Sequence, residues 1–413
     1  MKLLNFGSCN LDFVYSLDHI VAPGETEATV SSEIFPGGKG LNQSIAAARA
    51  GAEVYHAGCI GTDGGMLREI MAESGVDVSY LQTVDSKNGH AIIQVSRAGE
   101  NAIFLYPGSN EMLTEALIDR VLADFVPGDF LLLQNETNLV DVLVEKGSAR
   151  GLKIVLNPSP YNEKIRQIDL SKLSYLILNE VEAREIAGSD EPEVALGLLR
   201  KKYPGLAVVL TLGVKGCVYR DENETVYHPA FRVKAVDTTA AGDTFTGYFF
   251  AGLSEGLSVT EALRRASAAS ALAVSRMGAA PSIPYEKEVA EALQSLLPYG
   301  SASPDTSRKQ RVTDYIREHL REASLPGLAD LLGYSAAYTG ALVKKLTGRT
   351  FSALLQQERC GAAARLLTET GLSVEEIIYS VGYKNETFFR KAFRECYGCT
   401  PREYRKMREE KPL

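Results

Sequence analysis

The sequence predicts an α/β fold that is followed by a separate all-helical domain. Up to about residue 297, short apolar runs alternate with helical patterns, whereas beyond residue 308 short amphipathic helices are separated by Gly, Pro and Ser, with no strand candidate. A chain of 413 residues also exceeds what one hydrophobic core usually organises. We therefore expect one domain over residues 1–297, a linker over 298–307 and a second domain over 308–413.

The strand candidates of the first domain indicate how its sheet is built. Apolar strands that are separated by helices are typical of a parallel sheet with both faces covered. Segments near 10–35 and 88–106 instead alternate apolar and polar residues, and we expect them to form a small accessory sheet at the edge of the main one. The apolar runs are Phe130–Gln134, Lys153–Leu156, Tyr175–Leu178 and Ala207–Thr211.

Charge is distributed unevenly along the chain. The net charge of the whole chain is -8, yet residues 308–413 carry 19 Lys and Arg against 13 Asp and Glu. A basic C-terminal part on an acidic body indicates two kinds of partner, one of which is a polyanion. A solvated basic helix face gives the same pattern, so charge alone does not decide whether the C-terminal part binds a polyanion.

Location and cysteine use point the same way. No stretch approaches the roughly 20 apolar residues of a membrane span, and Met1–Gly7 lacks the apolar region of a signal peptide. Six scattered cysteines do not form a disulfide framework. Cys396 and Cys399 form a CxxC without a second ligand pair, which favours two partly buried helix-end thiols over a metal or redox site. We expect a cytoplasmic protein.

The most informative stretch is Val236–Phe245, in which small residues and Gly-Asp precede an apolar helix expected from Thr244 to Leu253. Small residues at a helix start let backbone N–H groups approach an anion, and the helix dipole favours its charge. Asp243 in the first turn is placed to accept a proton from an attacking hydroxyl. This combination suits phosphoryl transfer, although an ordinary capped helix gives the same local pattern.

Two N-terminal segments favour the phosphoryl-transfer interpretation. Asn10 and Asp12 occupy alternate positions at an expected strand end and so point the same way. The Gly-rich loop Pro36–Ser44 precedes an expected helix over Ile45–Ala50, and suits close approach to a polyhydroxylated ligand. The Gly-Lys-Ser/Thr of a nucleotide P-loop is absent, which argues against a Walker-type ATPase.

Together these segments resemble the ribokinase (PfkB) carbohydrate kinase family along essentially all of residues 1–297. The motifs Asn-x-Asp, Gly-Gly-Lys-Gly-x-Asn-Gln, Gly58–Asp63 and Asp-Thr-x-Ala-Ala-Gly-Asp occur in family order. The Gly-rich loop and Leu133–Glu136 resemble ribokinases more than adenosine, fructose or phosphofructose kinases. The resemblance implies a ribokinase-like three-layer α/β/α sandwich with a small β lid, and ATP-dependent phosphorylation of D-ribose at O5.

The resemblance also assigns roles to residues. It implies that Asp243 is the catalytic base and that Ala240, Ala241 and Gly242 form the anion hole. Asn179 and Glu182 match a motif that organises Mg²⁺ and phosphates, and Thr211, Gly213 and Gly216 match the loop that binds ATP together with Gly242. The sugar-binding positions are Asn10, Asp12, Gly38, Lys39, Asn42, Glu136 and Asp243. The positions that hold a monovalent cation, usually K⁺, are Asp237, Thr239, Ala273, Arg276, Gly278 and Ser282, several of them through carbonyls.

Two positions depart from the family pattern. Ser267 stands where ribokinases often place a His beside the adenine, which leaves the nucleotide contacts there open. Tyr248 stands where a small residue is common behind the anion hole. Neither departure removes a group that the reaction needs. The family also implies a homodimer in which the accessory sheet covers the sugar site.

The C-terminal part contains two similar units, each a short helix, a Gly-aromatic turn and a second helix, at 325–346 and 372–394. With the helix that joins them and the closing Gly-x-Thr-Pro-x-x-Tyr at Gly398–Tyr404, they resemble the AraC/XylS DNA-binding domain. The first unit has Ala337, Gly340 and Ala341 where that family presents polar side chains, so we expect weaker readout of double-stranded DNA there. The second carries the expected contacts Lys384, Asn385, Thr387, Arg390 and Lys391.

Three functions remain open from the sequence. The first and preferred one is an active ribokinase that also regulates transcription through its DNA-binding domain. The second is a sugar-sensing regulator with an inactive kinase fold, and the third is a kinase of another sugar or nucleoside. The intact Asp243, anion hole and Asn179/Glu182 pair favour catalysis, because a receptor needs no catalytic base. A helical domain retained only for assembly is the alternative to DNA binding.

Overall fold

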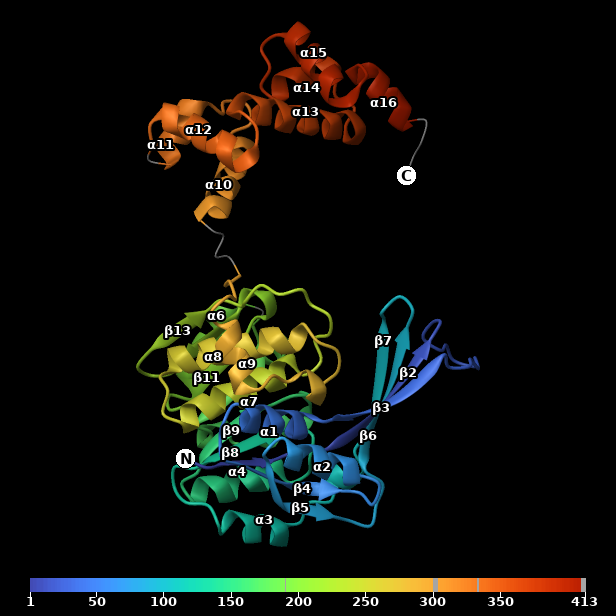
Figure 1. Ribbon diagram of the computed structural model, residues 1–413, viewed down its shortest axis with the longest axis vertical. Coiled ribbons are helices and arrows are strands. Elements are labelled where there is room, and N and C mark those ends of the chain that lie inside the picture. The colour runs from blue at the N-terminus through green and yellow to red at the C-terminus, as the bar shows by residue number, and fades with distance from the viewer. Residues whose placement is uncertain (190, 300–303, 333, 410–413) are drawn as a thin grey trace. The chain divides into compact units, whose positions relative to one another are not determined.

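The computed structural model describes residues 1–189, 191–299, 304–332 and 334–409. The chain divides into two compact units, Met1–Tyr299 and Gly300–Leu413 (Figure 1). Of the expected linker 298–307, residues 300–303 lie outside the described residues, Pro298 and Tyr299 belong to the first unit, and a helix already begins at Pro304. Within the described part of the chain, no helix is long and apolar enough to cross a membrane.

A mixed nine-stranded sheet in the order β13-β12-β11-β10-β9-β8-β1-β4-β5 forms the centre of the first unit. From β11 to β5 all pairings are parallel, and β12 and β13 add two antiparallel strands at one edge. The four strands expected from apolar runs are confirmed as β8 to β11. The strands are β1 Leu3–Phe6, β4 Val54–Ile60, β5 Asp77–Thr83, β8 Phe130–Gln134, β9 Lys153–Asn157, β10 Tyr175–Asn179, β11 Ala207–Thr211, β12 Cys217–Arg220 and β13 Thr225–His228.

Helices cover both faces of this sheet, as expected for strands that are apolar throughout (Figure 1). Leu132 of β8 packs into one apolar cluster, while its neighbours Leu131 and Leu133 pack into the other. Three layers are therefore required to bury every side chain of the strand. One face carries α1 Lys39–Arg49, α2 Gly65–Glu73, α7 Ala241–Ser254, α8 Val259–Val274 and α9 Glu286–Ala292, and the other carries α3 Glu115–Leu122, α4 Val140–Ala149, α5 Glu180–Ala187 and α6 Pro192–Lys202.

The accessory sheet expected from residues 10–35 and 88–106 is present, with the order β3-β2-β6-β7 (Figure 1). The expectation that Asn10 and Asp12 lie at the end of a strand is wrong, because β1 ends at Phe6 and both residues lie at the start of β2. They still share one face, since they lie two residues apart on that strand. The strands are β2 Asn10–Leu17, β3 Ser31–Gly37, β6 Gly89–Ser96 and β7 Asn101–Tyr106.

Helix α1 begins earlier than the sequence indicated. The Gly-rich segment was expected to be a loop up to Ser44, but the helix starts at Lys39, after Gly38 with a φ of 94°. Gly40 makes this possible, because its Cα lies against the backbone of Gly7 and Ser8, where a Cβ would come within 2.4 Å of the Ser8 nitrogen. Helix α7 likewise begins at Ala241, so Asp243 lies in its first turn.

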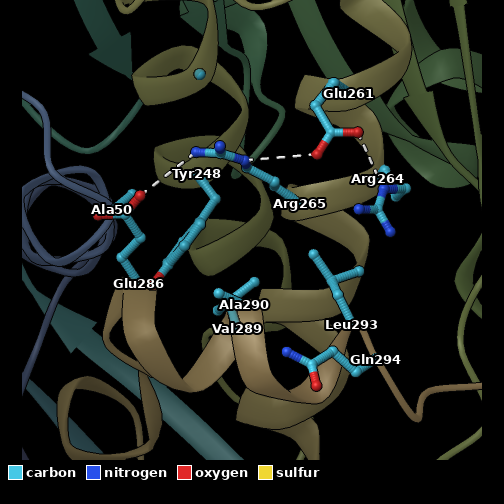
Figure 2. Close-up of a pocket in the computed structure, with 11 residues that line it drawn as sticks. Ala50, Tyr248, Glu261, Arg264, Arg265, Glu286, Val289, Ala290, Leu293 and Gln294 are labelled. Atoms are coloured by element: carbon cyan, nitrogen blue, oxygen red, sulfur yellow. Dashed lines mark hydrogen bonds and ion pairs between the residues drawn. The ribbon is translucent and has the colours of Figure 1, made fainter.

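A cavity of about 230 Å³ lies between α7, α8 and α9, and its charged side chains are paired with one another (Figure 2). Arg265 forms ion pairs with Glu255, Glu261 and Glu286 at 3.5–3.6 Å, and Arg264 pairs with Glu261 at 3.0 Å. Tyr248 also lines this cavity, and its hydroxyl donates to the Pro284 carbonyl at 2.8 Å. These contacts tie α8 and α9 to the C-terminal half of α7.

The second unit is helical throughout its described residues and contains two apolar clusters, one for each expected helix-turn-helix. Helix α13 contributes Phe351 to the first cluster and Cys360 to Leu367 to the second, so it joins the two. The expected Gly-aromatic turn at Gly382 and Tyr383 follows α14, whereas Gly333 of the first expected turn lies outside the described residues. The helices are α10 Pro304–Glu318, α11 Leu325–Leu332, α12 Ala336–Thr347, α13 Phe351–Glu369, α14 Val374–Ser380, α15 Glu386–Tyr397 and α16 Pro401–Glu409.

Candidate functional site

A polar cavity of about 410 Å³ lies at the carboxyl ends of the central strands. It is bordered by Lys39 of α1, by Asn179 and Glu182 at the start of α5, and by the first turn of α7 with Asp243. Crevices at the carboxyl ends of parallel strands are where α/β folds bind ligands. The structure therefore brings together residues that are more than 200 positions apart in the sequence.

Asp243 is buried, and two side-chain amides hold its carboxylate. Asn42 Nδ2 donates to Oδ2 at 3.1 Å, and Gln43 Nε2 donates to Oδ1 at 2.9 Å. Both donors lie on α1, which packs against α7. Asn42 was expected here as a sugar-binding residue, whereas Gln43 was not singled out although it lies in the same motif.

Gln43 is itself held by a chain of buried amides that the sequence analysis missed. Gln134 Nε2 donates to Gln43 Oε1 at 2.8 Å and to Asn5 Oδ1 at 3.0 Å. Asn5 Nδ2 in turn donates to Ser44 Oγ at 2.8 Å. The available signal was a polar residue within an otherwise apolar strand, Asn5 in β1 and Gln134 in β8. Fully buried amides require partners, so each of them points to another.

The first turn of α7 is shaped to receive an anion. Ala240, the residue before the helix, has a φ of 60°, a strained left-handed conformation for a residue other than Gly. Among the described residues, neither the N–H of Gly242 nor that of Asp243 finds an acceptor. The Cβ side of Gly242 is open space, without an atom within 4 Å. Ala240, Ala241 and Gly242 all border the cavity, as the anion-hole assignment requires.

Lys39 at the start of α1 and Glu136 after β8 are two charged residues that lie in contact with each other. Glu136 Oε2 accepts hydrogen bonds from the Ser8 hydroxyl and, at 3.0 Å, from the backbone N–H of Lys39. Burial raises the pKa of Glu136 in spite of these contacts. Burial alone lowers the pKa of Lys39, but Asp243, Glu136 and Glu182 outweigh it and leave the pKa raised. The ammonium of Lys39 is therefore a fixed positive charge among three carboxylates.

Asn10 and Asp12 project from β2 beside Glu136. Asn110 Nδ2 donates to Asn10 Oδ1 at 2.7 Å, and Asn10 and Glu136 border a further cavity of about 150 Å³. Within the described residues the Asp12 carboxylate accepts no hydrogen bond, and Gly37 leaves room for it, since a Cβ there would lie 2.0 Å from Oδ2. Burial, reinforced by Glu136, raises the pKa of Asp12 to about 7. Such a carboxylate has unused capacity to accept hydrogen bonds.

Asn179 and Glu182 interact with each other at the start of α5. Asn179 Oδ1 accepts from the N–H of Glu182 at 3.0 Å, and Glu182 Oε2 accepts from the N–H of Asn179 at 2.9 Å, which is a capping box. Asn179 Nδ2 also donates to Glu182 Oε1 at 3.1 Å. The pair thus has a local structural role, and its position on the cavity wall is compatible with the role expected from the sequence.

An apolar cavity of about 420 Å³ adjoins the polar one, and the two share Thr211, Gly213, Thr238, Ala241 and Gly242. The expected ATP-binding residue Gly216 borders the apolar cavity, as does Ser267. At Gly216 a Cβ would lie 2.1 Å from the His228 carbonyl oxygen, so the turn requires Gly. The structure therefore connects a polar pocket with an apolar pocket of a size that suits a planar base.

The expected cation-binding residues lie around the loop before α7 and the turn after α8. Asp237 Oδ1 accepts from the N–H and hydroxyl of Thr239, and Oδ2 accepts from the N–H of Gly278 at 3.0 Å. Burial acts to raise the pKa of Asp237, but these hydrogen bonds lower it on balance.

The other expected cation-binding residues already have partners within the protein. Arg276 pairs with Glu288 at 2.7 Å, and its backbone N–H donates to the Ala273 carbonyl. The Ser282 hydroxyl donates to the Ala279 carbonyl. Within the described residues, no group of three or more His, Cys, Asp or Glu side chains could hold a metal ion.

The second helix-turn-helix places its expected contacts at the start of α15. Lys384, Thr387 and Lys391 are exposed. Asn385 caps the helix, because its Oδ1 accepts from the N–H groups of Thr387 and Phe388. Arg390 is only half exposed and pairs with Glu386 at 3.2 Å. Two of the five expected residues therefore also have structural roles.

Two further features of this unit bear on a macromolecular partner. Phe388 is 71% exposed, and sequence reasoning missed it, although it lies outside the apolar stripe formed by Phe389, Ala392 and Phe393. In the first helix-turn-helix, Ala337 and Ala341 are exposed on α12 as expected, so that face offers few polar atoms.

The two thiols of the CxxC differ in exposure. Cys396 is exposed rather than partly buried, which corrects the expectation for this residue, and Cys399 is half-buried.

Comparisons with known proteins agree with this geometry. The pattern of the pfkB family carbohydrate kinases matches residues 1–286, and a helix-turn-helix domain pattern matches residues 328–407. The chain is 37% identical over 297 residues to a ribokinase of Haemophilus influenzae and 34% identical over 291 residues to one of Bacillus subtilis, covering 70% of this chain and 97% of each relative. The crystal structure of a Cryptococcus neoformans ribokinase in complex with ADP superposes with a TM-score of 0.63 and 35% identity, covering 70% of this chain and 99% of that one.

We expect Gly40→Ala to destabilise the first unit by at least about 2 kcal/mol, because its Cβ would overlap the backbone of Gly7 and Ser8. Gly65→Ala is the matched control, since Gly65 also lies in the first turn of a helix but no atom lies within 4 Å of its Cβ. Differential scanning calorimetry measures both. Equal transition temperatures for the two variants would contradict the close approach of α1 to the β1–β2 connection.

Proposed function

Because the chain belongs to the pfkB family of carbohydrate kinases over residues 1–286, we propose that it phosphorylates D-ribose at O5 to give ribose 5-phosphate. Kinases of the ribokinase family use ATP with Mg²⁺. The observation that carries the proposal is the Asp243 carboxylate, held by Asn42 and Gln43 where the polar cavity meets the first turn of α7. A carboxylate fixed beside free backbone N–H groups suits proton removal from a hydroxyl that attacks a phosphoryl group.

The sugar is proposed to bind between Asp243 and the accessory sheet. Asp12 and Glu136 accept hydrogen bonds from its hydroxyls, and Asn10 and Asn42 contribute amides. Lys39 balances the charge of the surrounding carboxylates, and Gly38 lets the backbone approach the sugar. Ribose is favoured over other sugars by the similarity to ribokinases of about 35% identity.

ATP is proposed to place its base in the apolar cavity and its phosphates in the polar one. Thr211, Gly213 and Gly216 border the apolar cavity, and Gly242 lies where the cavities join. The N–H groups of Gly242 and Asp243 are free to stabilise the transferred phosphoryl group. Mg²⁺ supplies positive charge to the phosphates, and because Asn179 and Glu182 already bond to each other, we assign them to hold water around the ion rather than to bind it directly.

A monovalent cation is proposed at the turn formed by Asp237, Thr239, Ala273, Arg276, Gly278 and Ser282. Asp237 supplies the negative charge, and the neighbouring Arg276 is neutralised by Glu288. Backbone carbonyls of this turn would provide further oxygen ligands, which K⁺ accepts. Because Asp237 also fixes Thr239, cation binding would order the loop that leads to Ala240.

The helix-turn-helix domain is proposed to bind double-stranded DNA mainly through α15. Lys384, Thr387 and Lys391 are exposed for phosphate and base contacts, and Phe388 presents an apolar surface suited to thymine methyl groups. We further propose a homodimer formed through the accessory sheet, since Ile34, Ile103 and Phe104 on it are each more than half exposed. An enzyme that uses ATP and binds DNA is proposed to act in the cytoplasm, where it would regulate transcription.

ATP-dependent phosphorylation of a panel of pentoses, hexoses and nucleosides tests the proposed reaction. We expect the highest kcat/KM with D-ribose and a higher rate with K⁺ than without it. Asp243→Asn should lower kcat by at least about 10³-fold, because an amide cannot accept the proton, while the Kd for ribose, measured by calorimetry, changes much less, since the isosteric side chain still accepts from one of the two amides of Asn42 and Gln43.

Two results would overturn the proposal in different ways. Measurable ribose binding without phosphorylation of any compound would indicate a sugar sensor. Undiminished turnover by Asp243→Asn would show that another group accepts the proton.

Ribose binding should weaken as the pH falls, because the carboxylate form of Asp12 accepts hydrogen bonds from the sugar and its pKa is about 7. Between pH 8 and pH 6 the Kd is expected to rise about tenfold, since the protonated form dominates below the pKa. Asp12→Asn should bind ribose weakly with a Kd that no longer depends on pH over this range. A pH-independent Kd of the wild-type protein would remove Asp12 from the sugar site.

Arg390→Ala combined with Lys391→Ala should weaken binding to a mixed-sequence DNA duplex about 10–100-fold, and should flatten its salt dependence, because two phosphate contacts are lost. Fluorescence anisotropy at several salt concentrations measures both effects. Lys309→Ala combined with Arg365→Ala removes the same charge from α10 and α13 and serves as the control. Equal affinities of the two double variants would argue against α15 as the DNA-binding helix.

A further inference from the structure

The first unit ends in a short segment whose last residue, Tyr299, borders the apolar cavity. The Leu297 carbonyl accepts from the Arg232 N–H at 2.9 Å, Pro298 pairs with Phe231 in an antiparallel bridge, and the Tyr299 N–H donates to the Ala230 carbonyl. Residues 297–299 are therefore docked as a short extended segment along residues 230–232. Ala230 and Phe231 border the cavity as well.

The side chain of Tyr299 lines this cavity, together with Phe231 and Val233. The residue is 48% exposed, so part of its ring is open, and the Arg232 guanidinium lies 5.7 Å from the ring centroid. An aromatic ring that borders an apolar cavity and keeps a free surface is suited to pack against a planar base. The stacking surface would be completed by a ligand rather than by the protein.

Tyr299 is also the residue at which the chain leaves the first unit. The compact unit ends there, and the covalent chain continues from it to α10 of the helix-turn-helix unit. A side chain that lines the apolar cavity and a backbone that leads to the second unit are thus found in one residue. No motif in the sequence marks this position.

We propose that Tyr299 packs against the base of the bound nucleotide, and that nucleotide binding thereby locks residues 297–299 onto residues 230–232. The inference rests on the proposed assignment of the apolar cavity to the base of ATP. Its consequence is that nucleotide occupancy determines whether the start of the connection to the helix-turn-helix unit is held or released.

The physical basis is a difference in affinity between two states of the segment. The hydrogen bonds from the Arg232 N–H to Leu297 and from the Tyr299 N–H to Ala230 together form the antiparallel bridge of Phe231 and Pro298, and a segment docked in this way at the end of a compact unit opens locally at low cost. A ligand that touches Tyr299 gains this contact only in the docked state. Binding therefore shifts the population towards the docked state.

Tyr299→Trp provides a direct reporter, because the chain contains no tryptophan. We expect its fluorescence to change on addition of Mg²⁺–ADP and to saturate together with calorimetric ADP binding. Tyr203→Trp is the matched control, since Tyr203 packs on the opposite face of the sheet and should not respond. Unchanged emission of Tyr299→Trp at saturating ADP would overturn the contact.

Tyr299→Ala should raise the Kd for ADP about tenfold, in the range expected for loss of one stacking contact. Tyr299→Phe should bind ADP like the wild type, because the ring and not the hydroxyl makes the contact. The KM for sugar and kcat at saturating ATP should stay unchanged in both variants. An unchanged Kd for ADP in Tyr299→Ala, with normal kinase activity, would refute the inference alone.

Hydrogen exchange measures the locking itself. In the wild-type protein ADP should slow exchange of the Arg232 and Tyr299 amides, and in Tyr299→Ala the protection of Arg232 by ADP should largely disappear. Equal protection in both proteins would show that the segment is docked independently of the ligand. If the wild-type protein neither binds ADP nor phosphorylates any sugar, the proposed function fails first, which separates the two hypotheses.

Discussion

The buried amide chain from Asn5 through Gln134 and Gln43 to Asp243 is the constraint on which the rest of the first unit depends. It links β1, β8, α1 and α7, and each member uses its amide to fix the next. A buried amide without a partner costs on the order of 1–3 kcal/mol, so the chain tolerates few alternative arrangements. The position of the Asp243 carboxylate is therefore set by the packing of four elements and not by the local turn alone.

The sequence predicts the parts of this structure that depend on local pattern. Apolar runs place β8 to β11 within a residue of their ends, and the Gly-Asp start of α7 places Asp243 in its first turn. The amide chain cannot be predicted from local pattern, because Gln134 and Asn5 are 129 positions apart and each looks like a single polar residue in a strand. The early start of α1 escapes for a similar reason, since only the distant Gly7 and Ser8 explain why Gly40 belongs to a helix.

Charge in the cavity follows from the same packing. Lys39 stands among Asp243, Glu136 and Glu182, which keep its ammonium charged in spite of burial. Asp12 lacks such a counter-charge, and its carboxylate accepts no hydrogen bond among the described residues, so burial raises its pKa to about 7. The site thus contains one carboxylate that is fully held by amides, Asp243, and one that is left for a ligand to satisfy, Asp12. This difference is compatible with the proposed roles, in which Asp243 accepts a proton and Asp12 binds the ligand.

The polar and the apolar cavity of the first unit differ in how firmly their walls are held. The polar cavity needs rigid positioning, which the buried amide chain provides. The apolar cavity is instead bordered by Tyr299, which is held by few contacts and leads to the second unit. A change of ligand at a rigid site is transmitted poorly, whereas a weakly held segment with two states responds to small differences in binding free energy. In the proposed function, coupling between nucleotide binding and the helix-turn-helix unit is therefore better sought at the apolar cavity than at the Asp243 carboxylate.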